Sequence, residues 1–173
     1  WYNGVYTPLK RKTPLAVIPG ALIGSLPPAI GWSAANGKLL DPFLLIVALF
    51  FFVWQIPHFW LLLLKFGDEF EEAGYPTLTS RYSNQQIARF TFFWIIVTVV
   101  VSMIIPVFGI GSSIFLYLGL FIVALWLLIS SRRLLNFHEE VQTLRNSFIH
   151  INAYIMLVMS FLTLDRILQS TPA

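Results

Sequence analysis

Residues 50–78 read FFFVWQIPHFWLLLLKFGDEFEEAGYPTL, and this stretch decides how the rest of the chain is interpreted. Its first half is apolar enough for a membrane-spanning helix, yet it contains Gln55, Pro57 and His58, which are costly in lipid. Its second half ends in a cluster of acidic residues. Helical spacing places one set of side chains on a common face: Trp54, His58, Lys65, Asp68 with Glu69, and Glu72. A polar stripe that ends in carboxylates predicts the wall and rim of a binding site.

The composition is typical of a membrane protein. Hydrophobic residues make up 57% of the chain and charged residues 11%, whereas soluble domains average about 25% charged residues. The absence of cysteine excludes thiolate metal sites, disulfides and cysteine nucleophiles. A net charge of +3 could indicate nucleic-acid binding, but the basic residues are better explained as signals of membrane orientation. We therefore expect a lipid bilayer around the chain and no nucleic-acid partner.

Five apolar segments are long enough to cross a bilayer, which takes roughly 17–25 residues. The predicted spans are residues 14–35, 42–65, 88–108, 112–131 and 147–168. Such long apolar runs exclude a barrel of short alternating strands. The sequence therefore predicts an all-α membrane protein, a single bundle of about five transmembrane helices over residues 1–173.

The basic residues predict how the bundle is oriented. With five spans joined by short connections, one side of the membrane collects Lys10, Arg11, Lys12, Lys65, Arg81, Arg89, Arg132, Arg133 and Arg145, and the other side collects Lys38 and Arg166. Cytoplasmic loops carry an excess of Lys and Arg. We predict that the basic side, which includes the acidic cluster, faces the cytoplasm or the mitochondrial matrix.

Prolines predict breaks in the first two spans. The first contains Pro19 and the pair Pro27–Pro28, and an interior proline removes a backbone hydrogen bond. Such a kinked helix could serve packing alone, or could open space for a bulky ligand. In the second span, Pro57 predicts a kink near Val53, with His58 beside it. That histidine could contact a ligand or form a packing hydrogen bond.

The charged residues around the second span predict a site for a Mg²⁺-bound phosphate ester. Mg²⁺ takes oxygen ligands, and basic side chains neutralise the remaining phosphate charge. The candidate metal ligands are Asp68, Glu69 and Glu72, and the candidate catalytic residues, placed to bind diphosphate, are Lys10, Arg11 and Lys65. Trp54, Phe59 and Trp60 could line an aromatic cavity above them. A solvated acidic loop would explain the same carboxylates without a metal.

Four collinear segments carry a family resemblance: YTPLKRKTP at 6–14, IPGALIGSLPPAIGW at 18–32, WQIPHF at 54–59 and DEFEEAGYPTL at 68–78. Together they resemble the protoheme IX farnesyltransferase (haem O synthase) family, which belongs to the UbiA-type intramembrane prenyltransferases. The match covers about residues 2–80, and the later helices agree in hydropathy and number only. The resemblance implies a nine-helix bundle whose fifth to ninth helices are the five predicted here.

The resemblance also implies a reaction. A farnesyl group would pass from farnesyl diphosphate to the vinyl group of haem B, giving haem O and pyrophosphate, with Mg²⁺ as cofactor. Haem A synthase or oxidase assembly factors would be partners, in a bacterial plasma membrane or a mitochondrial inner membrane. Substrate binding would involve Tyr6, Thr13, Trp54, Gln55 and His58.

The sequence departs from the family pattern in three places. Phe70 and Thr77 stand where a tyrosine and a methionine are usual. The first acidic motif of the family is not found in this sequence and would lie upstream of Trp1. We therefore expect the chain to be a fragment that is inactive on its own, because it would hold half of a Mg²⁺–diphosphate site.

Two alternatives remain open. A prenyltransferase for another acceptor, such as a quinone precursor, would share the acidic motif, although the segments at 6–14 and 54–59 argue against it. A transporter would be expected to contain internal repeats of broken helices, and the first span has no convincing repeat later in the chain. A structural membrane subunit would leave the acidic cluster unexplained except as a loop.

Overall fold

The computed structural model describes residues 1–109, 111, 113–138 and 141–170. All regular secondary structure in these ranges is helical. Five helical segments in them are long and apolar enough to cross a membrane: Pro14–Ala34, Pro42–Glu72, Asn84–Phe108, Ile114–Asn136 and Val141–Gln169. The prediction of an all-α membrane bundle of about five spanning helices is confirmed. Position 112, the predicted start of the fourth span, lies outside the described residues.

The first span is broken into short pieces, as its prolines predicted. A short N-terminal pair of helical turns, η1 (Tyr2–Tyr6) and α1 (Thr7–Leu9), precedes it. The span itself consists of η2 (Pro14–Ala16), α2 (Val17–Ala21), η3 (Leu22–Ser25) and α3 (Leu26–Ala34). The Trp1 indole Nε1 donates a hydrogen bond to the Pro19 carbonyl at 2.8 Å, so the N-terminal turns lie against this span.

Two glycines of the first span allow close approach of its neighbours. A Cβ atom added at Gly20 would lie 2.7 Å from the Tyr6 ring, too close for a real side chain. A Cβ atom added at Gly24 would collide with the Gln55 amide on the next helix. The absence of side chains therefore lets the N-terminal turns and the second span pack against the first.

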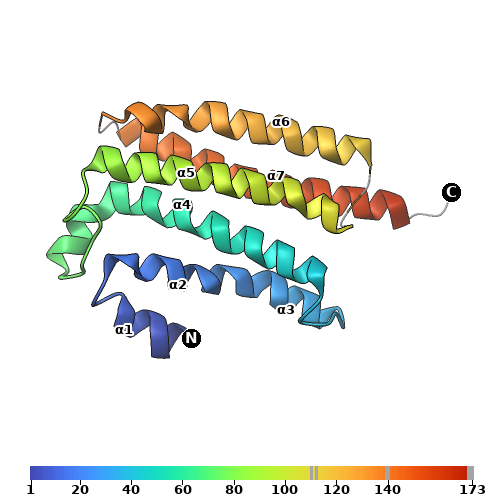
Figure 1. Ribbon diagram of the computed structural model, residues 1–173, viewed down its shortest axis with the longest axis horizontal. Helices are drawn as coiled ribbons and strands as arrows, with labels where there is room; N and C mark the ends of the chain where they lie inside the picture. The colour runs from blue at the N-terminus through green and yellow to red at the C-terminus, as the bar shows by residue number, and fades with distance from the viewer. Residues whose placement is uncertain (110, 112, 139–140, 171–173) are drawn as a thin grey trace.

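Helix α4 (Pro42–Glu72) lies at the centre of the bundle (Figure 1). Its N-terminus is capped by Asp41, whose Oδ1 accepts a hydrogen bond from the Phe43 backbone N–H at 2.9 Å. Within α4, all of which the structure describes, the backbone leaves the helical range at Phe66 alone, with φ −123° and ψ 19°. The structure therefore places a break at Phe66, which the sequence did not predict, while the kink expected near Val53 from Pro57 stays a prediction.

The remaining helices cover the other side of α4. They are α5 (Asn84–Ile104), η4 (Ile105–Phe108), α6 (Ile114–Ser131), η5 (Arg132–Asn136) and α7 (Val141–Ser170). Their shared core includes Phe50, Ile95, Leu127, Ile151 and Tyr154, all buried. Large apolar side chains such as Phe93, Phe115 and Ile122 are exposed on the outside, as expected where lipid replaces water.

The chain connections divide between the two ends of the bundle (Figure 1). The loop before Pro14, the link that follows α4, and η5 lie at one end. The connection between α3 and α4 lies at the other end, with η4. The three segments that carry most of the basic residues therefore share one end of the molecule, as the alternation of spans predicted.

Candidate functional site

A cavity of about 350 Å³ lies where the N-terminal turns, the start of the first span and α4 meet. Its polar lining consists of Tyr6, Lys10, Thr13, Tyr75 and Thr77. Its apolar lining includes Phe59, Leu62, Leu63, Phe70 and Leu78. The cavity lining thus combines apolar and aromatic side chains with an ammonium group and hydroxyls.

The ammonium group of Lys10 lies near two aromatic rings of the cavity lining. Its Nζ lies 5.8 Å from the centroid of Tyr6 and 5.4 Å from the centroid of Tyr75. Cations are attracted to aromatic faces at such distances, so the ammonium has a preferred position without an acidic partner. Burial raises the pKa of Tyr6, with smaller contributions from the nearby Tyr2 and Tyr75. The Tyr6 hydroxyl therefore stays protonated and can donate a hydrogen bond at neutral pH.

Trp54 and His58 face α7, on a different side of α4 from the cavity. The Trp54 indole Nε1 donates a hydrogen bond to the Ile151 carbonyl at 3.0 Å. The His58 ring centroid lies 4.8 Å from that of Trp54 and 4.9 Å from that of Phe148. Its Nδ1 is buried and has no hydrogen-bond partner among the described residues.

Gln55 and Trp60 point elsewhere. The Gln55 amide lies against Gly24 of the first span. The Trp60 ring packs edge-on against Trp94 of α5, with centroids 6.4 Å apart. Of the three aromatic residues predicted to line a cavity, Phe59 does so, while Trp54 and Trp60 contact neighbouring helices.

The acidic residues at the end of α4 fall into two kinds. Asp68, Glu69 and Glu72 are exposed. Glu71 Oε1 accepts hydrogen bonds from the hydroxyls of Thr77 and Thr79, the latter at 2.6 Å. Glu71 therefore fixes the chain that returns toward the cavity, and the other three carboxylates remain accessible from solvent.

The three exposed carboxylates have the oxygen donors that Mg²⁺ prefers. Within the described ranges, however, no three His, Asp or Glu side chains gather closely enough to hold a metal ion. Protein Mg²⁺ sites often contain one or two carboxylates that share the ion with substrate phosphates and water. The carboxylates of Asp68, Glu69 and Glu72 therefore fit Mg²⁺ by their chemistry, but they would supply only part of its ligands.

The predicted stripe is not continuous, because α4 breaks at Phe66. The residues before the break and the carboxylates after it do not follow one helical register. Lys65 is exposed, with its Nζ 4.7 Å from the Phe66 ring centroid, and Arg11 is also exposed. Among the described lining residues of the cavity, Lys10 is the cation that sequence reasoning proposed for diphosphate.

Sequence reasoning missed Tyr75, which closes the cavity opposite Tyr6. Gly74, at φ +78°, turns the chain after α4 and directs it back toward the N-terminal loop. The Gly–Tyr–Pro triplet is recognisable as a turn signal in the sequence. Its contact with Lys10, 65 positions earlier, depends on tertiary packing that no local pattern encodes.

Comparison with known proteins defines the family. A family model described as the UbiA prenyltransferase family matches residues 1–158. The chain belongs to the UbiA prenyltransferase family. This membership confirms the resemblance inferred from the four collinear segments, and it makes a transporter or a structural subunit an inferior explanation of the fold.

Curated UbiA-family relatives carry a more specific name. A protoheme IX farnesyltransferase of Geobacter sulfurreducens is 39% identical over 109 residues, covering 63% of this chain and 40% of the relative. One of Marinobacter nauticus is 33% identical over 166 residues, covering 95% of this chain and 54% of the relative. The chain therefore spans about half the length of the curated relatives it matches. No solved structure matches the chain significantly.

Proposed function

We propose that this chain is part of an intramembrane prenyltransferase that transfers a farnesyl group from farnesyl diphosphate to the vinyl group of haem B. One water molecule adds to the cation left on the former vinyl group, giving haem O and pyrophosphate. Family membership supports prenyl transfer, and the names of the relatives support farnesyl as donor group and protoheme as acceptor. The observation that carries the proposal is the cavity between the N-terminal turns and α4. It pairs one ammonium group with an apolar, aromatic wall, which is what a prenyl diphosphate requires.

The chemistry needs charge to separate at the allylic carbon. When diphosphate leaves, positive charge develops on the carbon and negative charge on the leaving group. Lys10 would neutralise the leaving group, and the Tyr6 and Thr13 hydroxyls would donate hydrogen bonds to it. Phe59 would present an aromatic face to the cation, and the leucines beside it would exclude water that could capture the cation.

We propose that Asp68, Glu69 and Glu72 contribute to a Mg²⁺ site shared with the diphosphate. When bound, Mg²⁺ would supply further positive charge to the leaving group. Glu71 is excluded from this set because two threonine hydroxyls already donate to its carboxylate. The resemblance implies that further ligands come from the other acidic motif of the complete enzyme. Arg11 and Lys65, both exposed at the same end, would contribute to the electrostatic attraction of the diphosphate.

We also propose that His58 contacts haem B. Its Nδ1 is buried and lacks a hydrogen-bond partner among the described residues, and this unpaired nitrogen supports the proposal. The excess of basic residues at the cavity end of the bundle supports placing that end on the cytoplasmic or matrix side. Association with haem A synthase or oxidase assembly factors remains a prediction of the resemblance.

The test is farnesyl transfer by the full-length enzyme that contains this chain, with Lys10→Met and Lys12→Met as a matched pair. Both changes remove one charge from the same loop, but Lys10 lines the cavity and Lys12 is exposed outside it. We expect Lys10→Met to lower kcat/KM about 100-fold, in the range found for loss of one group that stabilises a developing anion. Lys12→Met should stay within about twofold of wild type.

Haem B and a phenolic quinone precursor are offered in parallel, and the products are identified by mass. Equal effects of the two lysine variants would contradict the role of the cavity. Prenylation of the phenol with no conversion of haem B would contradict the proposed acceptor and leave the prenyltransferase assignment intact.

A further inference from the structure

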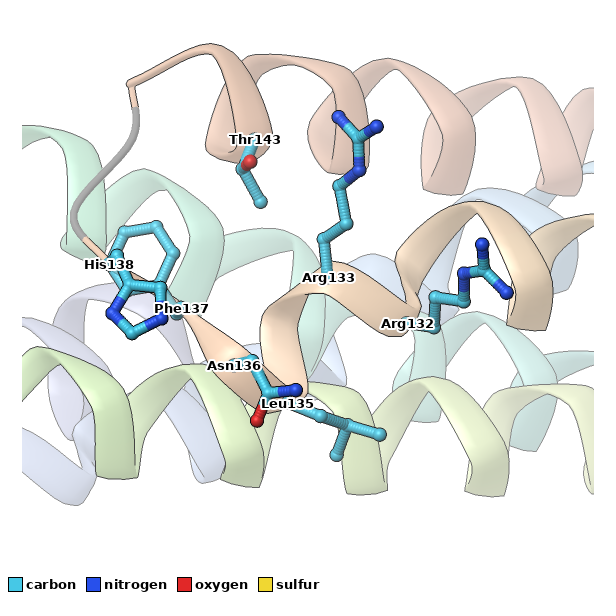
Figure 2. A pocket seen from close by; sticks show the side chains of 7 residues that line it. All are labelled: Arg132, Arg133, Leu135, Asn136, Phe137, His138 and Thr143. Carbon is cyan, nitrogen blue, oxygen red and sulfur yellow. The ribbon is translucent and has the colours of Figure 1, made fainter.

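A second and larger cavity, of about 560 Å³, lies between η5 and the first turns of α7 (Figure 2). Its polar lining consists of Arg132, Arg133, Asn136, His138 and Thr143. None of the described residues that line it also lines the cavity beside α4. The N-terminal loop and the end of α4, which contribute to the first cavity, lie at the same end of the bundle as η5 and the start of α7, which form the second.

The local fold holds this cavity in a fixed shape. After α6 ends, the chain continues as the 3₁₀ turn η5, in which Leu134 is fully buried. Arg89 of α5 donates a hydrogen bond from Nε to the Leu135 carbonyl at 3.1 Å, which ties η5 to α5. Phe137 and Thr143, which also line the cavity, are both 5% exposed. The buried Leu134 and the hydrogen bond from Arg89 therefore anchor the backbone that carries the two arginines.

The two arginines leave this anchored turn toward solvent. Both are exposed, and Arg133 extends from η5 toward the first turns of α7 (Figure 2). Guanidinium groups present planar sets of N–H donors that match phosphate oxygens, and they are weakly hydrated compared with ammonium groups. The Asn136 amide and the His138 ring are further polar groups of the lining.

Leu135 of the cavity lining, and two residues on the neighbouring turns, are exposed apolar side chains. Leu135 is 41% exposed, Ile129 on the last turns of α6 is 54% exposed, and Val141 at the start of α7 is 65% exposed. A ligand held by the arginines would lie beside side chains that face lipid. A soluble phosphate would leave that apolar edge uncovered, whereas the acyl chains of a lipid would cover it.

We propose that the cavity between η5 and α7 binds the phosphate group of an anionic membrane phospholipid. Basic pockets at the ends of transmembrane helices recognise such headgroups. The shared chemistry is a phosphate oxyanion, so free phosphate or pyrophosphate could engage the same two arginines. The apolar edge favours the lipid.

The proposal is tested by native mass spectrometry of the detergent-purified protein with added dioleoylphosphatidylglycerol or dioleoylphosphatidylcholine. The test variant is Arg132→Gln with Arg133→Gln. The matched control is Arg81→Gln with Arg145→Gln. It also removes two positive charges, from exposed arginines that are not among the described residues lining the cavity. Wild type should retain one phosphatidylglycerol in preference to phosphatidylcholine. The test variant should bind it at least about tenfold more weakly, and the control should change less than about threefold.

Equal weakening in the two double variants would overturn the proposal, because it would show diffuse attraction to a basic surface. Arginine-dependent binding of inorganic phosphate or pyrophosphate, without preference for phosphatidylglycerol, would also overturn it in favour of a soluble anion. Melting temperatures without added lipid should match among all forms. If the double variant has a lower melting temperature than wild type, Arg133→Lys is used in its place. This change keeps the positive charge but removes the paired N–H donors of the guanidinium, and it should still weaken phosphatidylglycerol binding about threefold.

Discussion

The two faces of α4 carry neighbouring residues but serve different purposes. Toward the N-terminal turns, Phe59, Leu62 and Leu63 line a cavity that Lys10 also lines. Toward α7, Trp54 donates a hydrogen bond to the Ile151 carbonyl, and the His58 ring contacts Phe148. A shift of about one position around a helix separates side chains that line a cavity from side chains that contact α7.

The largest expected effect on turnover distinguishes the exposed carboxylates of Asp68 and Glu72 from the carboxylate of Glu71, which accepts two hydrogen bonds. In the full-length enzyme, Asp68→Asn with Glu72→Gln should lower kcat about 100-fold and raise the Mg²⁺ concentration needed for half-maximal rate, because metal ligands would be lost. Glu71→Gln should lower kcat less than about tenfold with no change in the Mg²⁺ requirement, since this carboxylate accepts hydrogen bonds from Thr77 and Thr79. Steady-state kinetics across a Mg²⁺ titration measure both.

The control for this comparison is thermal stability. Glu71→Gln should lower the melting temperature measurably, whereas the Asp68→Asn with Glu72→Gln double variant should not. Near-native turnover of the Asp68/Glu72 double variant at every Mg²⁺ concentration would remove these carboxylates from the metal site, and a raised Mg²⁺ requirement in Glu71→Gln would add that residue to it.

Sequence patterns predicted the fold more completely than the site. The apolar runs, the broken first span and the gathering of basic segments at one end depend on composition and chain order, and the structure agrees with them. The assignment of single side chains to the cavity depends on which helix packs on which face of α4, and on the break at Phe66. Helical spacing groups Trp54 with His58 correctly, but it cannot indicate that α7 covers this group.

A tenfold effect on KM is expected from Gly20→Ala, which displaces the Tyr6 ring of the cavity lining. The Cβ of Gly20→Ala would meet the Tyr6 ring at 2.7 Å, so the ring must move, and Lys10 with it. We expect KM for farnesyl diphosphate to rise about tenfold, with a loss of about 1–3 kcal/mol in stability from overpacking. Gly31→Ala is the matched control in the same span, since its Cβ has nothing within 4 Å.

If Gly31→Ala raised KM as much as Gly20→Ala, the effect would belong to the backbone of the first span and not to the contact with Tyr6. An unchanged KM in Gly20→Ala would mean that the Tyr6 side of the cavity does not touch the diphosphate substrate. Either result would weaken the assignment of the cavity to the prenyl donor.

The smallest effects belong to the face of α4 that contacts α7. Trp54→Phe keeps an aromatic ring but removes the N–H that donates to the Ile151 carbonyl, so it should cost about 1 kcal/mol of stability and leave turnover within about twofold. His58→Phe keeps the ring contact with Phe148 and removes the nitrogen that would meet haem. It should preserve the melting temperature and reduce haem retained on purification several-fold, as measured by absorbance. Retention of haem at the wild-type level would make both residues part of the packing between α4 and α7.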